Sequence, residues 1–75
     1  MINQEQIIKV IAEALGVNEK NININSKSIE IPEWDSLGHL SILSAISQNF
    51  EGKYKESQEL ASATSIKEIV DCLNK

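Results

Sequence analysis

The most informative segment of the sequence reads Trp34-Asp35-Ser36-Leu37-Gly38-His39-Leu40, and it spans the end of a polar loop and the start of an expected helix. Beyond it, Ile42, Ile46 and Phe50 recur every four positions, which is the spacing of one face of an α-helix. Asp35 and Ser36 are both residues that cap helix N-termini well. We therefore expect a helix over residues 36–50.

Two leucines of this helix stand apart from its isoleucine stripe. Leu37 and Leu40 fall off the centre of the face that Ile42 and Ile46 define. The pattern predicts that both leucines are partly exposed near the helix start. There they are either the edge of the core or part of a surface that contacts a partner.

An amphipathic first helix is expected over residues 4–15. Asn3 can cap it, and Gln6, three residues later, completes a capping-box pattern. Gly16 suits the left-handed position just past the helix end. The helical spacing predicts a buried face made of Ile7, Ile8, Ile11, Ala14 and Leu15.

The segment from residue 17 to residue 34 has no helical pattern. Two isoleucine pairs alternate with polar residues as in a strand, but each run is too short to stand alone. Intervening Asn and Ser residues favour turns, and Pro32 disfavours a helix before it. We expect an ordered loop whose isoleucines point into the core, namely Ile22, Ile24, Ile29 and Ile31.

Two shorter helical segments are expected after Gly52, a stop signal. The first is a helical turn over residues 56–61, and the second is a helix over residues 65–73 with a capping-box pattern. The buried face of the last helix is expected to be Ile66, Ile69, Val70 and Leu73. Together these patterns predict a single all-α domain over residues 1–75, a small bundle of three longer helices and one short helix.

The net charge of −4 is concentrated in the middle of the chain. Residues 1–27 and residues 53–75 each sum to zero, so the excess comes from residues 28–52, which contain no Lys or Arg. An acidic centre argues against nucleic-acid binding, which requires phosphate neutralisation. It favours basic partner surfaces, although a solvated acidic loop without a role is the simpler alternative.

Composition excludes several classes of function. A chain of 75 residues has a marginal core, and its single Cys72 and single His39 cannot form a disulfide or a metal site. We expect no metal, no catalytic residues and no membrane span, and a cytoplasmic monomer is the simplest interpretation.

Ser36 is the candidate functional residue. It lies at a helix N-terminus, where unpaired backbone N–H groups and the positive end of the helix dipole favour an anion such as a phosphate. A hydrolase triad of Asp35, Ser36 and His39 is rejected, because residues this close at a helix start do not form the relay. His39 is instead expected to be exposed near the phosphate. Trp34 is expected to be packed as a structural anchor, with a partner contact as the alternative.

Here the sequence resembles the acyl carrier protein family. Asp35-Ser36-Leu37 matches the Asp-Ser-Leu signature in which the serine of that family receives 4′-phosphopantetheine. The order of a first helix, long loop, signature, second helix and two shorter helices also agrees, so the resemblance covers essentially the whole chain. It implies a four-helix bundle of acyl-carrier type that is not itself an enzyme.

The resemblance also implies a cofactor and partners. A phosphopantetheinyl transferase would attach the arm to Ser36, and a ligase would load an acyl or aminoacyl group as a thioester for use by acyltransferases. The surface expected to contact these partners comprises Glu33, Asp35, Leu37, Leu40 and Ser41. The cargo remains open among fatty acyl, hydroxyacyl, aminoacyl and D-alanyl groups.

The sequence departs from fatty-acid carriers, whose second helix is rich in acidic residues. The corresponding face here is uncharged and reads Ser41, Ser44, Ser47, Gln48 and Asn49. We therefore expect a dedicated pathway rather than bulk fatty-acid synthesis. The alternatives are a helical protein-interaction module without a cofactor and a degenerate carrier that is never modified.

Overall fold

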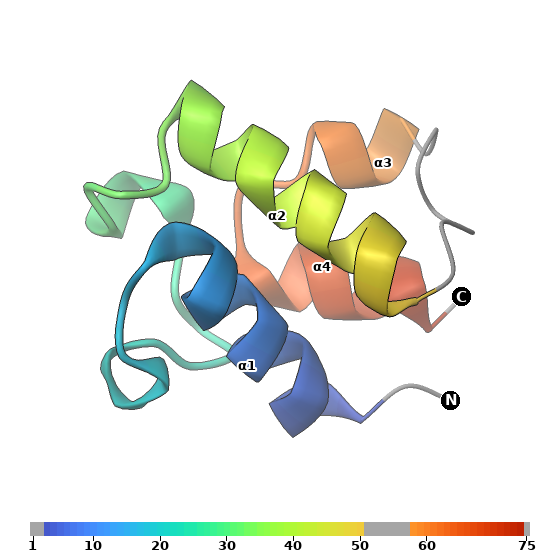
Figure 1. Cartoon of the computed structure of the whole chain (residues 1–75), viewed down its shortest axis with the longest axis horizontal. Coiled ribbons are helices and arrows are strands. Elements are labelled where there is room, and N and C mark those ends of the chain that lie inside the picture. Colours follow the sequence, from blue (N-terminus) through green and yellow to red (C-terminus); the bar gives the residue numbers. More distant parts are fainter. Residues whose placement is uncertain (1–2, 51–57, 75) are drawn as a thin grey trace.

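Helices joined by an ordered loop account for the described part of this computed structural model, residues 3–50 and 58–74 (Figure 1). In chain order the elements are α1 (Gln4–Leu15), the 3-10 turns η1 (Glu19–Asn21) and η2 (Ser28–Glu30), α2 (Ser36–Asn49), α3 (Gln58–Ala61) and α4 (Ile66–Leu73). Within these ranges there is no strand beyond an isolated bridge between Lys27 and Ser65. The predicted all-α class is confirmed, while Gly52 and the start of the predicted 56–61 turn lie outside the described residues.

The first helix begins and ends as its sequence predicts. The Asn3 side chain accepts a hydrogen bond from the backbone N–H of Glu5 at 2.7 Å, and Gly16 adopts a left-handed conformation with φ of 72°. The buried face is rotated slightly from the prediction. Val10 and Ala12 are buried, whereas the predicted Ile8 and Ala14 are only partly buried.

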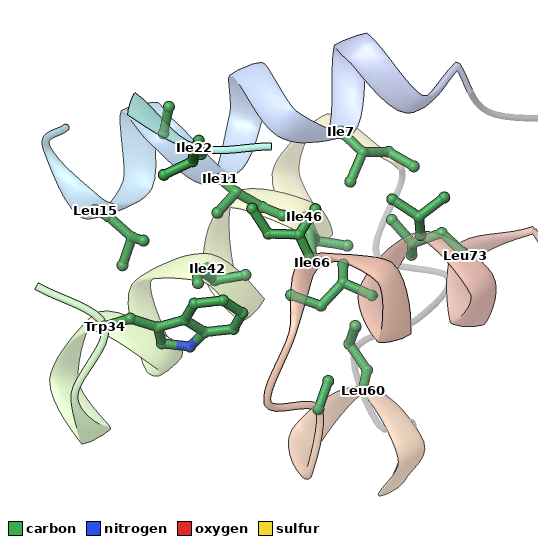
Figure 2. Close-up of a cluster of buried hydrophobic side chains, with 14 of the residues drawn as sticks. Ile7, Ile11, Leu15, Ile22, Trp34, Ile42, Ile46, Leu60, Ile66 and Leu73 are labelled. Carbon is green, nitrogen blue, oxygen red and sulfur yellow. The ribbon is translucent and has the colours of Figure 1, made fainter. Parts of the chain in front are cut away.

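The core lies where α1, α2 and α4 meet (Figure 2). α1 packs mainly against α2, and α3 contacts both α2 and α4. The most deeply buried side chains are nearly all isoleucines: Ile7, Ile11, Ile42, Ile46, Leu60, Ile66 and Ile69. A core of one branched aliphatic type depends on close interdigitation, so we expect it to tolerate little change in side-chain volume.

The loop before α2 is tied to the connection between α3 and α4. The Ser28 N–H donates to the Thr64 carbonyl at 2.8 Å, and the Ile66 N–H donates to the Ser26 carbonyl at 3.1 Å. These bonds make the loop ordered, as predicted. They also bring the residues that precede α2 beside the end of α3.

One prediction about the loop isoleucines is wrong. Ile22 and Ile31 are buried and Ile24 is partly buried, but the Ile29 side chain is 91% exposed. The reason is that residues 28–30 form a 3-10 turn, which rotates successive side chains by about a third of a turn. Burying Ile31 therefore turns Ile29 to solvent.

The last helix is confirmed with its cap. Ser65 accepts a hydrogen bond from the Glu68 N–H at 3.2 Å, while the Glu68 carboxylate accepts from the Thr64 N–H at 2.7 Å rather than from Ser65 itself. All four predicted core residues are buried, and so is Cys72. None of the helices in residues 3–50 and 58–74 has the length and hydropathy needed to cross a bilayer.

Candidate functional site

Ser36 is the first residue of α2, and its side chain is exposed. The helix is capped by Asp35, whose carboxylate accepts a hydrogen bond from the Gly38 N–H at 2.8 Å. Among the described residues, no acceptor is present for the backbone N–H groups of Ser36 and Leu37. The positive end of this 14-residue helix therefore coincides with an accessible hydroxyl.

A glycine allows the loop to lie directly against the first turn of α2. A Cβ built on Gly38 would overlap the backbone carbonyl oxygen of Glu33, and it would stand only 3.0 Å from Cδ2 of Leu15. A carbonyl fixed in an ordered loop cannot move aside cheaply. Gly38 therefore permits the close approach of the loop at Glu33 to the first turn of α2, beside Leu15 of α1.

Trp34, in the loop before α2, and His39, on α2, form a hydrogen-bonded pair. The indole Nε1–H of Trp34 donates to Nδ1 of His39 at 2.9 Å, and the two rings are nearly parallel at 10° with centroids 6.1 Å apart. Trp34 is buried, with 5% of its surface exposed, and its ring lies beneath Ile42 in the core (Figure 2). The prediction of Trp34 as a structural anchor is confirmed.

The second ring nitrogen of His39 makes a further hydrogen bond, which reaches α3. Nε2 lies 3.1 Å from the carbonyl oxygen of Leu60. Since an indole N–H only donates, Nδ1 must accept, and the proton of the neutral ring must be on Nε2, which donates to Leu60. His39 thus joins the loop, α2 and α3, and the prediction that it is an exposed residue is wrong.

A groove open to solvent runs beside Ser36 between α2 and the end of α3. It has a volume of about 590 Å³. Its lining includes Ser36, the Trp34–His39 pair, the apolar Leu40 and Leu43, the hydroxyl-bearing Ser28, Ser62 and Thr64, and the carboxylate of Asp35. The groove is therefore mixed in character, and Asp35 is the only carboxylate among the described residues that line it.

The residues expected to contact partners are all at the surface. Leu37 is 75% exposed and Leu40 is 61% exposed, and the side chains of Glu33, Asp35 and Ser41 are also exposed. Leu37 and Leu40 are three residues apart on α2 and are therefore neighbours on its surface. Apolar and acidic side chains thus surround Ser36 at the surface.

Two features of the site escaped the sequence analysis. The hydrogen bond between His39 and the Leu60 carbonyl joins residues 21 positions apart, so no local pattern indicates it. The exposure of Ile29 also escaped it, because Ile29 and Ile31 alternate with polar residues as in a strand, whereas residues 28–30 form a 3-10 turn.

The chain matches no known family model, and no solved structure matches it.

Proposed function

We propose that this chain is a carrier protein that holds acyl or aminoacyl groups on a 4′-phosphopantetheine arm attached to Ser36. The observation that carries the proposal is the position of the Asp35-Ser36-Leu37 signature. Its serine is exposed at the N-terminus of a 14-residue helix, beside a groove. The fold that goes with this function is a four-helix bundle of acyl-carrier type.

The site has the chemistry to hold the phosphodiester of such an arm. A phosphate on the Ser36 oxygen would lie next to the N–H groups of Ser36 and Leu37, which have no partner within the described part of the chain. The carboxylate of Asp35 is nearby but is already engaged by the Gly38 N–H. The surroundings of Ser36 therefore fit the group.

Attachment would be a substitution at phosphorus carried out by a separate transferase. The Ser36 hydroxyl oxygen attacks the pantetheine-bearing phosphorus of coenzyme A, and the bond from that phosphorus to the bridging oxygen of the pyrophosphate breaks. Adenosine bisphosphate leaves, and the serine proton passes to a base of the transferase. The attached arm supplies a thiol that carries cargo as a thioester.

The role of this chain in the later chemistry is to tether and to be recognised. A cargo bound to a folded domain reaches each partner active site at a high effective concentration. Exposed Leu37 and Leu40 provide apolar contact area, and the exposed carboxylates of Glu33 and Asp35 favour a partner with basic residues. The uncharged surface of α2 beyond residue 40 supports a dedicated pathway over bulk fatty-acid synthesis.

One observation also favours the alternative of an interaction module without a cofactor. Three large apolar side chains are exposed among the described residues, namely Ile29, Leu37 and Leu40. Leu37 and Leu40 are neighbours on the surface of α2, and adjacent exposed apolar side chains favour contact with another protein. That module would need no reaction at Ser36.

Intact mass spectrometry separates the two functions. The protein is incubated with coenzyme A and a broad-specificity phosphopantetheinyl transferase, with a known carrier as positive control. We expect a gain of about 340 Da in the wild-type chain. Ser36→Ala should abolish the gain, whereas Ser41→Ala, an exposed serine of the same helix, should keep it.

No mass gain in the wild-type chain, under conditions that modify the known carrier, would contradict the proposal and favour the interaction module. A gain that persists in Ser36→Ala would show that another residue reacts.

A further inference from the structure

We infer that His39 closes the seam between α2 and α3, by which we mean the contact between His39 of α2 and Leu60 of α3. This carrier therefore displays short, polar acyl groups at its surface and excludes long alkyl chains from its core. The inference rests on the proposed function. It concerns the class of cargo, which the identity of the attachment site leaves open.

The seam is closed by hydrogen bonds as well as by packing. His39 on α2 accepts from Trp34 at 2.9 Å and donates to the Leu60 carbonyl of α3 at 3.1 Å. A chain entering between the two helices would have to separate these groups. The imidazole N–H would then lose the Leu60 carbonyl as its partner in a partly buried place, where an unsatisfied donor is unfavourable.

The space behind the seam is already filled. Ile42, Ile46 and Leu60 are each no more than 1% exposed, and none of them lines the groove. The Trp34 ring occupies the position beneath Ile42 (Figure 2). Because protein interiors are close-packed, an alkyl chain could enter only by displacing these side chains.

The groove outside the seam suits a different cargo. Ser28, Ser62 and Thr64 bring hydroxyl groups to its lining beside the apolar Leu40 and Leu43. Among the described residues that line it, Asp35 is the only carboxylate and none is a lysine or an arginine. Such a lining is compatible with an amide, a hydroxyl or an ammonium group, and it offers no counter-charge to an acidic acyl group.

Trp34 and His39 are the only tryptophan and the only histidine of the chain, so each gives an unambiguous NMR signal. We would load the protein with acetyl-, alanyl- and octanoyl-pantetheine from amide-linked coenzyme A analogues, which cannot lose their cargo by hydrolysis. Mass spectrometry would first confirm each adduct. The readouts are the Trp34 indole N–H shift, the methyl shifts of Ile42 and Leu60, and the melting temperature.

In the wild-type protein we expect the octanoyl and acetyl forms to share the same indole and methyl shifts and the same melting temperature. In His39→Ala, the octanoyl chain should enter the core, shift the methyl signals and raise the melting temperature by about 4 °C or more above the acetyl form. His39→Gln can accept from Trp34 and donate to Leu60, so it should restore exclusion. Trp34→Phe is a second way to open the seam if His39→Ala does not fold.

Stabilisation of the wild-type protein by the octanoyl chain, with shifted methyl signals, would overturn the inference. So would an octanoyl form of His39→Ala that behaves like the acetyl form. Absence of any adduct would instead overturn the proposed function and this inference with it, whereas a complete adduct with octanoyl inside the core would overturn this inference alone.

Discussion

The two ends of α2 face different surroundings although they belong to one continuous helix. Toward its C-terminus, Ile42 and Ile46 are fully buried in the core, where α2 packs mainly against α1. At its N-terminus, Leu37 and Leu40 are mostly exposed around Ser36. One half of the helix therefore holds the fold together, while the other half is available to other molecules. Substitutions at one end of α2 should leave the other end as it is.

The largest loss of stability is expected from Ile46→Ala. Truncating this side chain, which is 1% exposed, removes buried methyl groups and leaves a cavity, so the free energy of unfolding should fall by about 2–5 kcal/mol. Leu40→Ala in the same helix should change it by no more than about 0.5 kcal/mol. Urea unfolding followed by circular dichroism measures both, and equal losses would contradict the division of α2 into two ends. If Ile46→Ala does not fold, Ile46→Val should cost about 1 kcal/mol.

Gly38→Ala should also destabilise the protein, although alanine is the better helix former. The added Cβ overlaps the Glu33 carbonyl, and overpacking of this kind costs about 1–3 kcal/mol. Ser44→Ala, at an exposed position of the same helix, is the matched control and should be neutral or slightly stabilising. A Gly38→Ala protein as stable as the control would show that the loop does not lie against the helix as described.

Substitutions of Asp35, the cap of α2, are expected to have a smaller effect on stability. Two of them distinguish the hydrogen bond of this side chain from its charge. Asp35→Ala removes the acceptor for the Gly38 N–H and should cost about 1 kcal/mol in thermal or urea unfolding. Asp35→Asn keeps an acceptor and should cost almost nothing. Equal losses in the two variants would indicate that the carboxylate acts through its charge rather than as a cap.

The smallest loss of stability is expected from substitutions of the exposed Leu37 and Leu40, although these substitutions should weaken recognition by a partner enzyme. Leu37→Ser and Leu40→Ser should leave the free energy of unfolding within about 0.5 kcal/mol of wild type. Each should lower the kcat/KM of a phosphopantetheinyl transferase acting on this chain by about fivefold, the size of a modest interface contact. Lys67→Ser on α4 is the exposed control. An unchanged kcat/KM in both variants would show that Leu37 and Leu40 do not belong to the partner surface.

Much of this arrangement follows from local sequence patterns. The spacing of Ile7 and Ile11, and of Ile42 and Ile46, predicts which helix faces are buried, because helical periodicity is a local property. The exposure of Leu37 and Leu40 follows from the same geometry. The exposed position of Ser36 follows from the loop-to-helix boundary, which Asp35 marks.

What could not be predicted depends on contacts between distant segments. His39 is half-buried only because Trp34 and Leu60 meet it from two other elements. The need for a glycine at position 38 arises from the Glu33 carbonyl, whose approach depends on how the preceding loop is tied to the α3–α4 connection. Ile29 is exposed because the turn around it is 3-10 rather than extended.

The proposal that Ser36 receives the arm that carries cargo can be tested on the protein isolated from its own cell. Intact-protein mass spectrometry with fragmentation, under conditions that preserve thioesters, reports both the site and the mass of any adduct. We expect an adduct of about 340 Da plus a short acyl group, located at Ser36. A chain recovered entirely without an adduct, while other carriers in the same extract have theirs, would contradict it.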